Sequence, residues 1–297
     1  MAPHVHSHPV DADTDGRRLG VALALILGFM AVEVVAGLLA SSLALLSDAA
    51  HMLGDAAALG LALVALRLAA RPPSGAMTFG LKRLEPLSAL INGVALAVLG
   101  AVFAVGGIAR LASPSDVDGV VVLVTAAAGI PVNLAAARVL AGARRRSINV
   151  EGAFAHVVTD LYAFILTAVA GAVIVIAGFD RADALAALAV AALMLWAALG
   201  LLRTSGRIFM EASPRSIDPN EVGRALAGEH GVVEVHDLHV WELTSGFPSL
   251  SAHVVVGTDA DCHGVRSQLE AMLVNRFEIS HSTLQVEHEH TELLTIE

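Results

Sequence analysis

Residues 150–178 read VEGAFAHVVTDLYAFILTAVAGAVIVIAG, an apolar run that contains one histidine and one aspartate in its first half. A helix of about 20 apolar residues spans the hydrocarbon core of a bilayer, and this run is long enough to do so. Five further runs of similar character occur along the chain, so the sequence predicts six membrane-spanning helices. The predicted ranges are 19–40, 43–69, 84–110, 117–142, 150–178 and 182–204.

Composition and charge divide the chain into an apolar part and an acidic tail. The mean hydropathy is +0.72 and 56% of the residues are hydrophobic, far more than in a soluble domain. Residues 212–297 hold 14 Asp and Glu against 4 Lys and Arg, which accounts for the whole net charge of −10. An acidic tail disfavours nucleic acid and favours cations, although a merely soluble surface is also often acidic.

The placement of basic residues predicts the orientation of the helices. Arg and Lys gather before the first helix, in the second and fourth loops and after the sixth helix, whereas the odd-numbered loops offer only Arg110 and Arg181. The positive-inside rule then places both termini in the cytoplasm. The predicted organisation is a His-bearing arm (1–16), a membrane domain (17–211) and a cytoplasmic metal-binding and dimerisation domain (212–297).

The tail alternates between helical and extended patterns. Asp218, Pro219 and Glu221 form the start signal of one helix, and apolar spacing predicts another over 261–277. Runs of β-branched residues predict three strands, at 232–243, 250–256 and 282–287. The predicted fold class is an α-helical membrane protein of six transmembrane helices with a C-terminal cytoplasmic α+β domain, which has the order αββαβ and is metallochaperone-like.

Histidine and aspartate recur with one spacing in two predicted membrane helices. His51 and Asp55 are four residues apart, as are His156 and Asp160, so each pair lies on one helix face. Two such pairs on facing helices supply two imidazole nitrogens and two carboxylate oxygens, a set that suits a tetrahedral Zn²⁺. The alternative is a pair of polar contacts between helices. The duplication favours a metal site, because carboxylates inside a membrane need a partner.

Three other polar residues lie in the predicted membrane helices. Asp48 precedes His51 by three residues and shares its face, so we expect it to hydrogen-bond to the ligands. Direct metal binding and proton transfer are the alternatives for Asp48. Glu33 and Asn92 are explained equally well by hydrogen bonds between helices and by a role in transport.

Residues 47–55, 149–160 and 235–241 resemble the cation diffusion facilitator family of zinc transporters. The resemblance extends from about Arg17 to Glu289. It implies a homodimeric antiporter that exports a divalent cation, Zn²⁺ above all, in exchange for protons. The Ala- and Arg-rich composition indicates a bacterial source, so the expected location is a bacterial plasma membrane. By position, it makes His51, Asp55, His156 and Asp160 the transport ligands.

The resemblance also implies a metal site in the tail, near a dimer interface. His239 follows His236 by three residues, which in a regular strand places it on the opposite face, so packing is its expected role. Arg83 and Glu211 match a basic–acidic pair of the family, although Arg83 is equally explained by positive-inside placement. The tail positions that match metal ligands are His236 and His253, with Glu287 or His288 from the last strand and His281 as a further candidate.

Two other classes of function are weighed against transport. An intramembrane metallohydrolase needs an open coordination position and a general base, and the sequence contains no HExxH motif. A membrane-anchored metal sensor uses the tail but leaves the duplicated membrane pairs unexplained. The sequence therefore predicts a transporter rather than an enzyme. Its expected partners are a second copy of the chain, the lipid bilayer and protons, with Zn²⁺ as cargo and regulatory ligand and no organic cofactor or nucleic acid.

Overall fold

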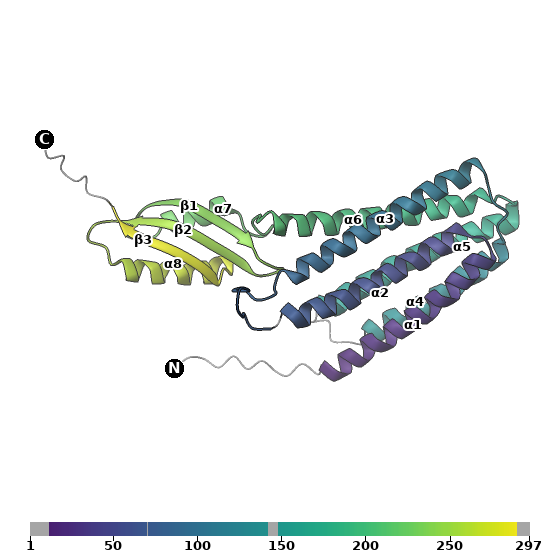
Figure 1. Ribbon diagram of the computed structural model, residues 1–297, viewed down its shortest axis with the longest axis horizontal. Helices are drawn as coiled ribbons and strands as arrows, with labels where there is room; N and C mark the ends of the chain where they lie inside the picture. The colour runs from purple at the N-terminus through teal and green to yellow at the C-terminus, as the bar shows by residue number, and fades with distance from the viewer. Residues whose placement is uncertain (1–11, 70, 142–147, 290–297) are drawn as a thin grey trace. The chain divides into compact units, whose positions relative to one another are not determined.

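The structure, a computed structural model, describes residues 12–69, 71–141 and 148–289 (Figure 1). Several side chains inside the helices also lie outside the described part, including those of the predicted ligands Asp55 and His156. Most of the predicted N-terminal arm lies outside it as well. The chain divides into two compact units, Met1–Gly60 with Asn92–Gly200 and Leu61–Ile91 with Leu201–Glu297, and each is described by itself.

Long helices form at the six places where the sequence predicts them. The first helix begins at Ala12, whereas the sequence predicted a start at residue 19. The prediction followed the apolar run, and residues 12–18 are mostly polar. A helix can continue beyond its apolar part. The helices are α1 (Ala12–Leu39), α2 (Leu43–Ala69), α3 (Leu84–Ala112), α4 (Gly119–Ala141), α5 (Ile148–Ala177) and α6 (Arg181–Phe209).

The outer faces of these helices are apolar. Among the described residues, α3, α6 and the Asp160–Ala177 part of α5 are each long and apolar enough to cross a membrane. Along α3, the side chains of Val98, Val102, Val105 and Ile108 are all exposed and recur every three or four residues. A continuous exposed apolar stripe on a helix is suited to contact with lipid or with another apolar helix.

In the first unit, α1, α4 and α5 pack closely because glycines remove side chains from their contacts. A Cβ atom on Gly171 of α5 would lie 2.6 Å from the backbone nitrogen of Leu123 in α4. A Cβ atom on Gly129 of α4 would lie 2.6 Å from the ring of Phe164 in α5. Phe29 of α1 meets the Phe164 ring edge to face, with centroids 5.5 Å apart. These contacts hold α5, and with it Asp160, against α1 and α4.

The second unit contains the αββαβ domain, as the sequence predicts. A helix begins at its predicted cap, where the Asp218 side chain accepts a hydrogen bond from the Asn220 amide and Pro219 occupies the first turn. Strands β1 and β2 are antiparallel, and β2 and β3 are parallel, joined by a helix as a crossover. The elements are α7 (Pro219–Ala227), β1 (Val232–Glu242), β2 (Pro248–Val256), α8 (Cys262–Phe277) and β3 (His281–His288).

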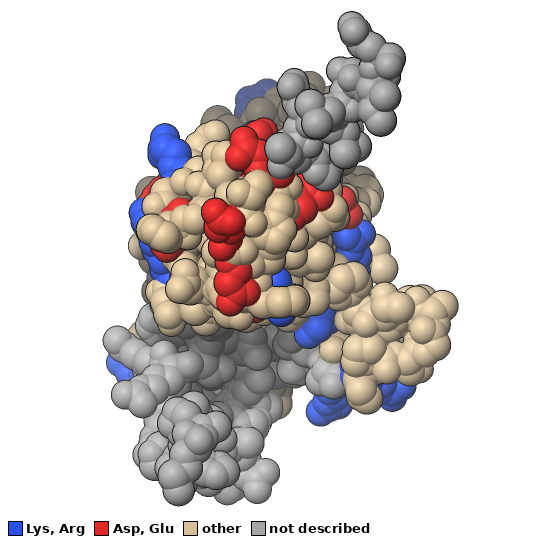
Figure 2. Space-filling view, turned by 90° about the vertical axis from the view of Figure 1, so that its left-hand side faces the viewer, with Lys and Arg blue, Asp and Glu red and all other residues tan. Residues whose placement is uncertain are grey.

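The three-stranded sheet has one covered face and one open face. Alternate residues of β2, Leu250, Ala252, Val254 and Val256, are buried in a core shared with the apolar side chains of α7 and α8. Because side chains alternate along a strand, His253 of β2 points away from this core. Figure 2 shows Asp and Glu side chains gathered on the surface of the αββαβ domain that faces the viewer. The part of the domain surface that Figure 2 shows is therefore rich in acidic side chains.

Candidate metal-binding sites

The first candidate site lies between α2 and α5. Nε2 of His51 is 3.8 Å from Oδ1 of Asp160, and both side chains are buried, with exposed fractions of 8% and 1%. Two ligand atoms held about 2.0–2.1 Å from a tetrahedral Zn²⁺ lie roughly 3.3 Å apart. The structure thus brings together one side chain from each predicted pair, close to the separation that a shared metal ion requires.

Two more carboxylates lie beside this pair. Glu33 of α1 and Asp48 of α2 are fully buried, and Glu33 is close enough to Asp48 and Asp160 to interact electrostatically with both. Asp48 is thus near the site, as its position on the His51 face predicts. Three carboxylates close together in an apolar interior need cations or protons to offset their charge. The composition of this cluster is suited to binding a cation.

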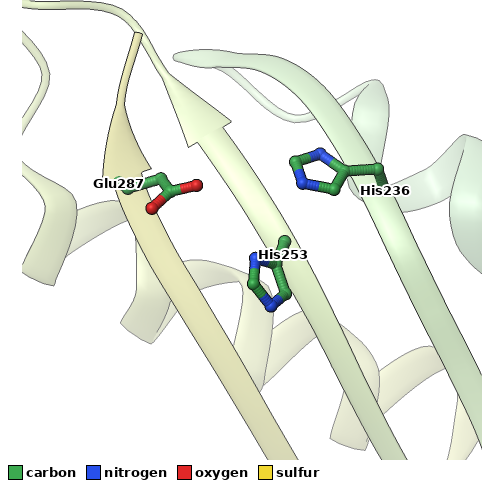
Figure 3. A group of neighbouring side chains, drawn as sticks. All are labelled: His236, His253 and Glu287. Atoms are coloured by element: carbon green, nitrogen blue, oxygen red, sulfur yellow. The ribbon is translucent and has the colours of Figure 1, made fainter. Parts of the chain in front are cut away.

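The second candidate site lies on the open face of the sheet in the αββαβ domain. His236 of β1, His253 of β2 and Glu287 of β3 each offer a ligand atom, and these atoms all lie within 4.8 Å of one another (Figure 3). His236 and His253 are direct cross-strand partners, and their ring centroids are 5.3 Å apart. Because each ligand comes from a different strand, the pairing of the strands creates the site.

The structure places the other two predicted tail residues elsewhere. His281, at the start of β3, packs against the rings of Phe79 and Phe247, with centroid distances of 5.5 and 5.7 Å. His288, at the end of β3, lies 3.5 Å from Sγ of Cys262 and 3.0 Å from the carbonyl oxygen of Ala260, both distances being from its Nε2. Of the two alternatives from the last strand, Glu287 is the one that joins the histidine pair.

The prediction that His239 packs on the strand face opposite to His236 is wrong. The pairing shifts between His236, which pairs with His253, and His239, which pairs with Ser251. Two residues of β1, Asp237 and Leu238, therefore oppose one residue of β2, Ala252. This is a β-bulge, and Asp237 within it has a φ of 51°, in the left-handed region. The extra residue puts His239 on the same face as His236. His239 is exposed there and pairs with Asp237, with Nε2 and Oδ1 3.0 Å apart, instead of packing.

The predicted contact between Arg83 and Glu211 is confirmed. Arg83 donates a hydrogen bond of 2.9 Å from Nη2 to Oε1 of Glu211, and both side chains are substantially exposed. The sequence analysis did not single out a further buried acid of the first unit, Asp183. Asp183 is 1% exposed and accepts hydrogen bonds from the start of α2. The sequence feature that could have revealed this residue is an aspartate in the first turn of a largely apolar helix, α6.

A bundle of apolar helices with buried imidazole and carboxylate groups, joined to a small α+β domain, is typical of a membrane protein that transports cations. The family model described as "Cation efflux transmembrane domain" matches residues 19–210, and the one described as "Cation efflux protein, cytoplasmic domain" matches residues 214–289. The chain therefore belongs to the cation efflux family, also called cation diffusion facilitators. It is an integral membrane transporter with a cytoplasmic C-terminal domain and not an enzyme, so the metallohydrolase alternative is wrong.

Relatives match almost the whole chain. The "Cadmium, cobalt and zinc/H(+)-K(+) antiporter" of Bacillus subtilis is 35% identical, over 96% of this chain and 92% of its own length. The "Metal cation efflux system protein CzcD" of Cupriavidus metallidurans is 37% identical over 96% and 90%. The "Zinc transporter ZitB" of Escherichia coli is 36% identical over 96% and 93%.

One solved structure also matches part of the chain. It is described as "Metal-bound C-terminal domain of the CzcD transporter from Cuprividus metallidurans" and is 42% identical. The match covers 24% of this chain and 99% of the solved chain, with a TM-score of 0.23.

Proposed function

We propose that this protein exports Zn²⁺ from the cytoplasm in exchange for protons. The transported ion is held by His51 and Asp55 from α2 and by His156 and Asp160 from α5. The observation that supports this most directly is the approach of His51 to Asp160, 3.8 Å apart in a buried site between two helices. The names of the relatives support the cargo and the counter-ion, since they include a zinc transporter and a cadmium, cobalt and zinc/H(+)-K(+) antiporter.

The residue types favour zinc over harder ions. Imidazole nitrogens suit Zn²⁺, Co²⁺ and Ni²⁺, whereas Mg²⁺ and Mn²⁺ favour sites built from oxygen ligands alone. Two histidines and two aspartates also complete a tetrahedral shell, which is the geometry that Zn²⁺ adopts most often in proteins. Asp48, buried on the His51 face, orients the ligands by hydrogen bonding to them.

Proton exchange follows from the chemistry of these ligands. Zn²⁺ binds deprotonated imidazole and carboxylate groups, so entry of the ion releases protons and protonation releases the ion. Histidine changes its charge near physiological pH, so a modest pH difference across the membrane changes the occupancy of the site. Loading then occurs while the site is open to the cytoplasm, and protons from the other side displace the ion after the helices rearrange.

The tail site serves as a regulatory zinc site in a homodimer. His236, His253 and Glu287 already lie within 4.8 Å of one another, so small side-chain rotations bring them to ligand distances. Two tails with a charge of −10 each repel one another, and bound divalent cations offset that repulsion. Zinc in the cytoplasm therefore draws the two tails together and favours transport.

The proposed function assigns a role to each of three parts of the chain. Residues 17–211 span a bacterial plasma membrane as six helices, residues 212–297 form the cytoplasmic metal-binding domain, and residues 1–16 are a cytoplasmic arm. Both termini then face the cytoplasm, in agreement with the basic residues of the even-numbered loops.

Zinc flux in proteoliposomes tests this proposal. Zn²⁺ uptake, read with an internal zinc dye, should require the wild-type protein and a pH gradient of the correct sign, and collapse of the gradient should slow it. Asp160→Ala should abolish the flux. Thr167→Val is the matched control, because Thr167 is buried two turns further along α5 and the substitution leaves the acidic cluster intact. Flux in Asp160→Ala at the wild-type rate would contradict the site.

The same assay distinguishes a zinc transporter from a membrane-anchored zinc sensor. A sensor binds zinc through its tail but moves none across the bilayer. Zinc binding by the reconstituted protein without any zinc flux under either gradient would contradict the proposal that zinc is the transported ion.

A further inference from the structure

The amino end of α2 is capped by a carboxylate from another helix. Asp183, in the first turn of α6, accepts a hydrogen bond from the hydroxyl of Ser42. It also accepts bonds of 2.8 Å from the Leu43 amide and 3.3 Å from the Ala44 amide. The first amides of a helix have no partners within that helix and are usually capped by the residue before it. Here Ser42 caps only Leu45, at 3.2 Å, and Asp183 supplies the rest.

A third helix completes this junction. Nη1 of Arg110, in the last turn of α3, lies 3.5 Å from Oδ2 of Asp183 and also donates to the carbonyl oxygen of Ser41. The Asp183 side chain is 1% exposed, so its charge is offset by the guanidinium group and by the positive ends of two helices. One carboxylate thus joins the ends of α2, α3 and α6.

The junction and the proposed metal ligand His51 lie on the same helix, α2, so a movement of the helix start also moves His51. His51 follows Leu43 by eight residues, a distance of about 12 Å along a helix, and lies two turns from the cap. If α2 slips by one residue, it moves about 1.5 Å and turns about 100° relative to its neighbours. Such a slip takes Nε2 of His51 away from Oδ1 of Asp160, which is 3.8 Å from it in this structure.

We propose that Asp183 is a positioning residue for transport: its contacts with the start of α2 fix the height and rotation of that helix, and thereby the geometry of the ion site. Asp183 does not touch the ion. This inference rests on the proposed function of the His51–Asp160 site, since its consequence for transport requires that site. Asp183 also couples the position of α2 to the positions of α3 and α6, because its contacts with Leu43 and Arg110 form only while the three helix ends stay together.

The test compares Asp183→Ala, Asp183→Asn and a matched control in the full-length protein. Asp118→Ala is the control, because Asp118 caps its own helix, α4, through the amides of Val120 and Val121 at 3.1 and 3.2 Å and is exposed. Both substitutions to Ala therefore remove a capping carboxylate, but of the two carboxylates only that of Asp183 caps a helix other than its own.

Hydrogen exchange and zinc flux give two independent readings. In Asp183→Ala, the amides of Leu43 and Ala44 should exchange faster, and the KM for zinc should rise about tenfold or more while the protein stays folded. Asp183→Asn keeps one acceptor oxygen and should lie between Asp183→Ala and wild type. Asp118→Ala should keep a KM within about twofold of wild type and leave the two α2 amides protected. A lower kcat with unchanged KM in Asp183→Ala would overturn the positioning role.

Failure of this inference is distinguishable from failure of the proposed function. If wild-type protein moves no zinc, the proposed function is wrong, and exchange at Leu43 and Ala44 alone decides whether Asp183 holds α2. If wild type transports zinc but Asp183→Ala keeps both the amide protection and the KM, the inference is wrong and the function stands. If Asp183→Ala does not fold, Ser42→Ala removes one of the same bonds and should raise the KM in the same direction.

Discussion

Removal of His253 should abolish tight zinc binding by the tail and leave the membrane site intact. His253 is on the central strand β2, which pairs with both β1, the strand of His236, and β3, the strand of Glu287. His253→Ala leaves an imidazole and a carboxylate on strands that are not paired with each other. The sheet should survive the change, because this side chain lies on the face away from the buried core.

The size of the effect follows from the number of ligands. A structural zinc site with four ligands contributes about 10–16 kcal/mol of binding free energy, or about 3 kcal/mol for each ligand. Since 1.4 kcal/mol is a tenfold change in an equilibrium constant, loss of one ligand should weaken zinc binding by about 10²-fold. A β-strand side chain that only packs on a surface would change zinc binding by much less.

Calorimetric titration of the full-length protein in detergent measures this change. Wild type should show two classes of zinc site, and His253→Ala should show the loss of one class with the other unchanged. His230→Ala is the control, because His230 is exposed in the turn before β1 and outside the three-residue group. Equal zinc isotherms for wild type and His253→Ala would refute the assignment of this cluster as a zinc site.

Three further outcomes are expected. His51→Asp should retain transport but shift selectivity toward manganese, because a hard oxygen replaces an imidazole nitrogen; unchanged relative rates across a metal series would count against the site. Exchanging charges with Arg83→Glu and Glu211→Arg should restore part of the thermal stability that each single change loses, by about 0–1 kcal/mol since the pair is exposed; strictly additive losses would exclude the pairing. Gly171→Ala should lower the melting temperature, with a cost of about 1–3 kcal/mol, because the new Cβ atom would lie 2.6 Å from the Leu123 backbone nitrogen; a melting temperature equal to wild type would show that α4 and α5 can separate without cost.

Much of the fold could be predicted because it depends on local properties of the chain. Apolar runs of bilayer length predict the long helices, and the cap at Asp218 predicts the start of α7, which the structure confirms. The αββαβ order followed from the change between helical and extended periodicity. The start of α1 was missed, because polar residues can extend a helix without changing its apolar pattern.

The candidate sites were predictable only where the ligands share a helix. The spacing of His51 and Asp55, or of His156 and Asp160, follows from 3.6 residues per turn and needs no knowledge of the fold. In the tail, the sequence left five candidates, since nothing local distinguishes Glu287 from His288 or separates His281 from the group. The pairing of β3 with β2 puts Glu287 beside the histidines and leaves His281 against Phe79 and Phe247.

By itself, the sequence determined that this protein has apolar helices with histidine and aspartate on one face, followed by an acidic αββαβ domain. The tertiary structure alone decided which distant side chains meet: Glu33 with Asp48, and Asp183 with the start of α2. It also decided that His239 shares a face with His236, through a single extra residue in β1. The physical reason is that helix and strand periods are set by neighbouring residues, whereas a buried charge is stabilised by whichever partners the packing of separate elements brings within reach.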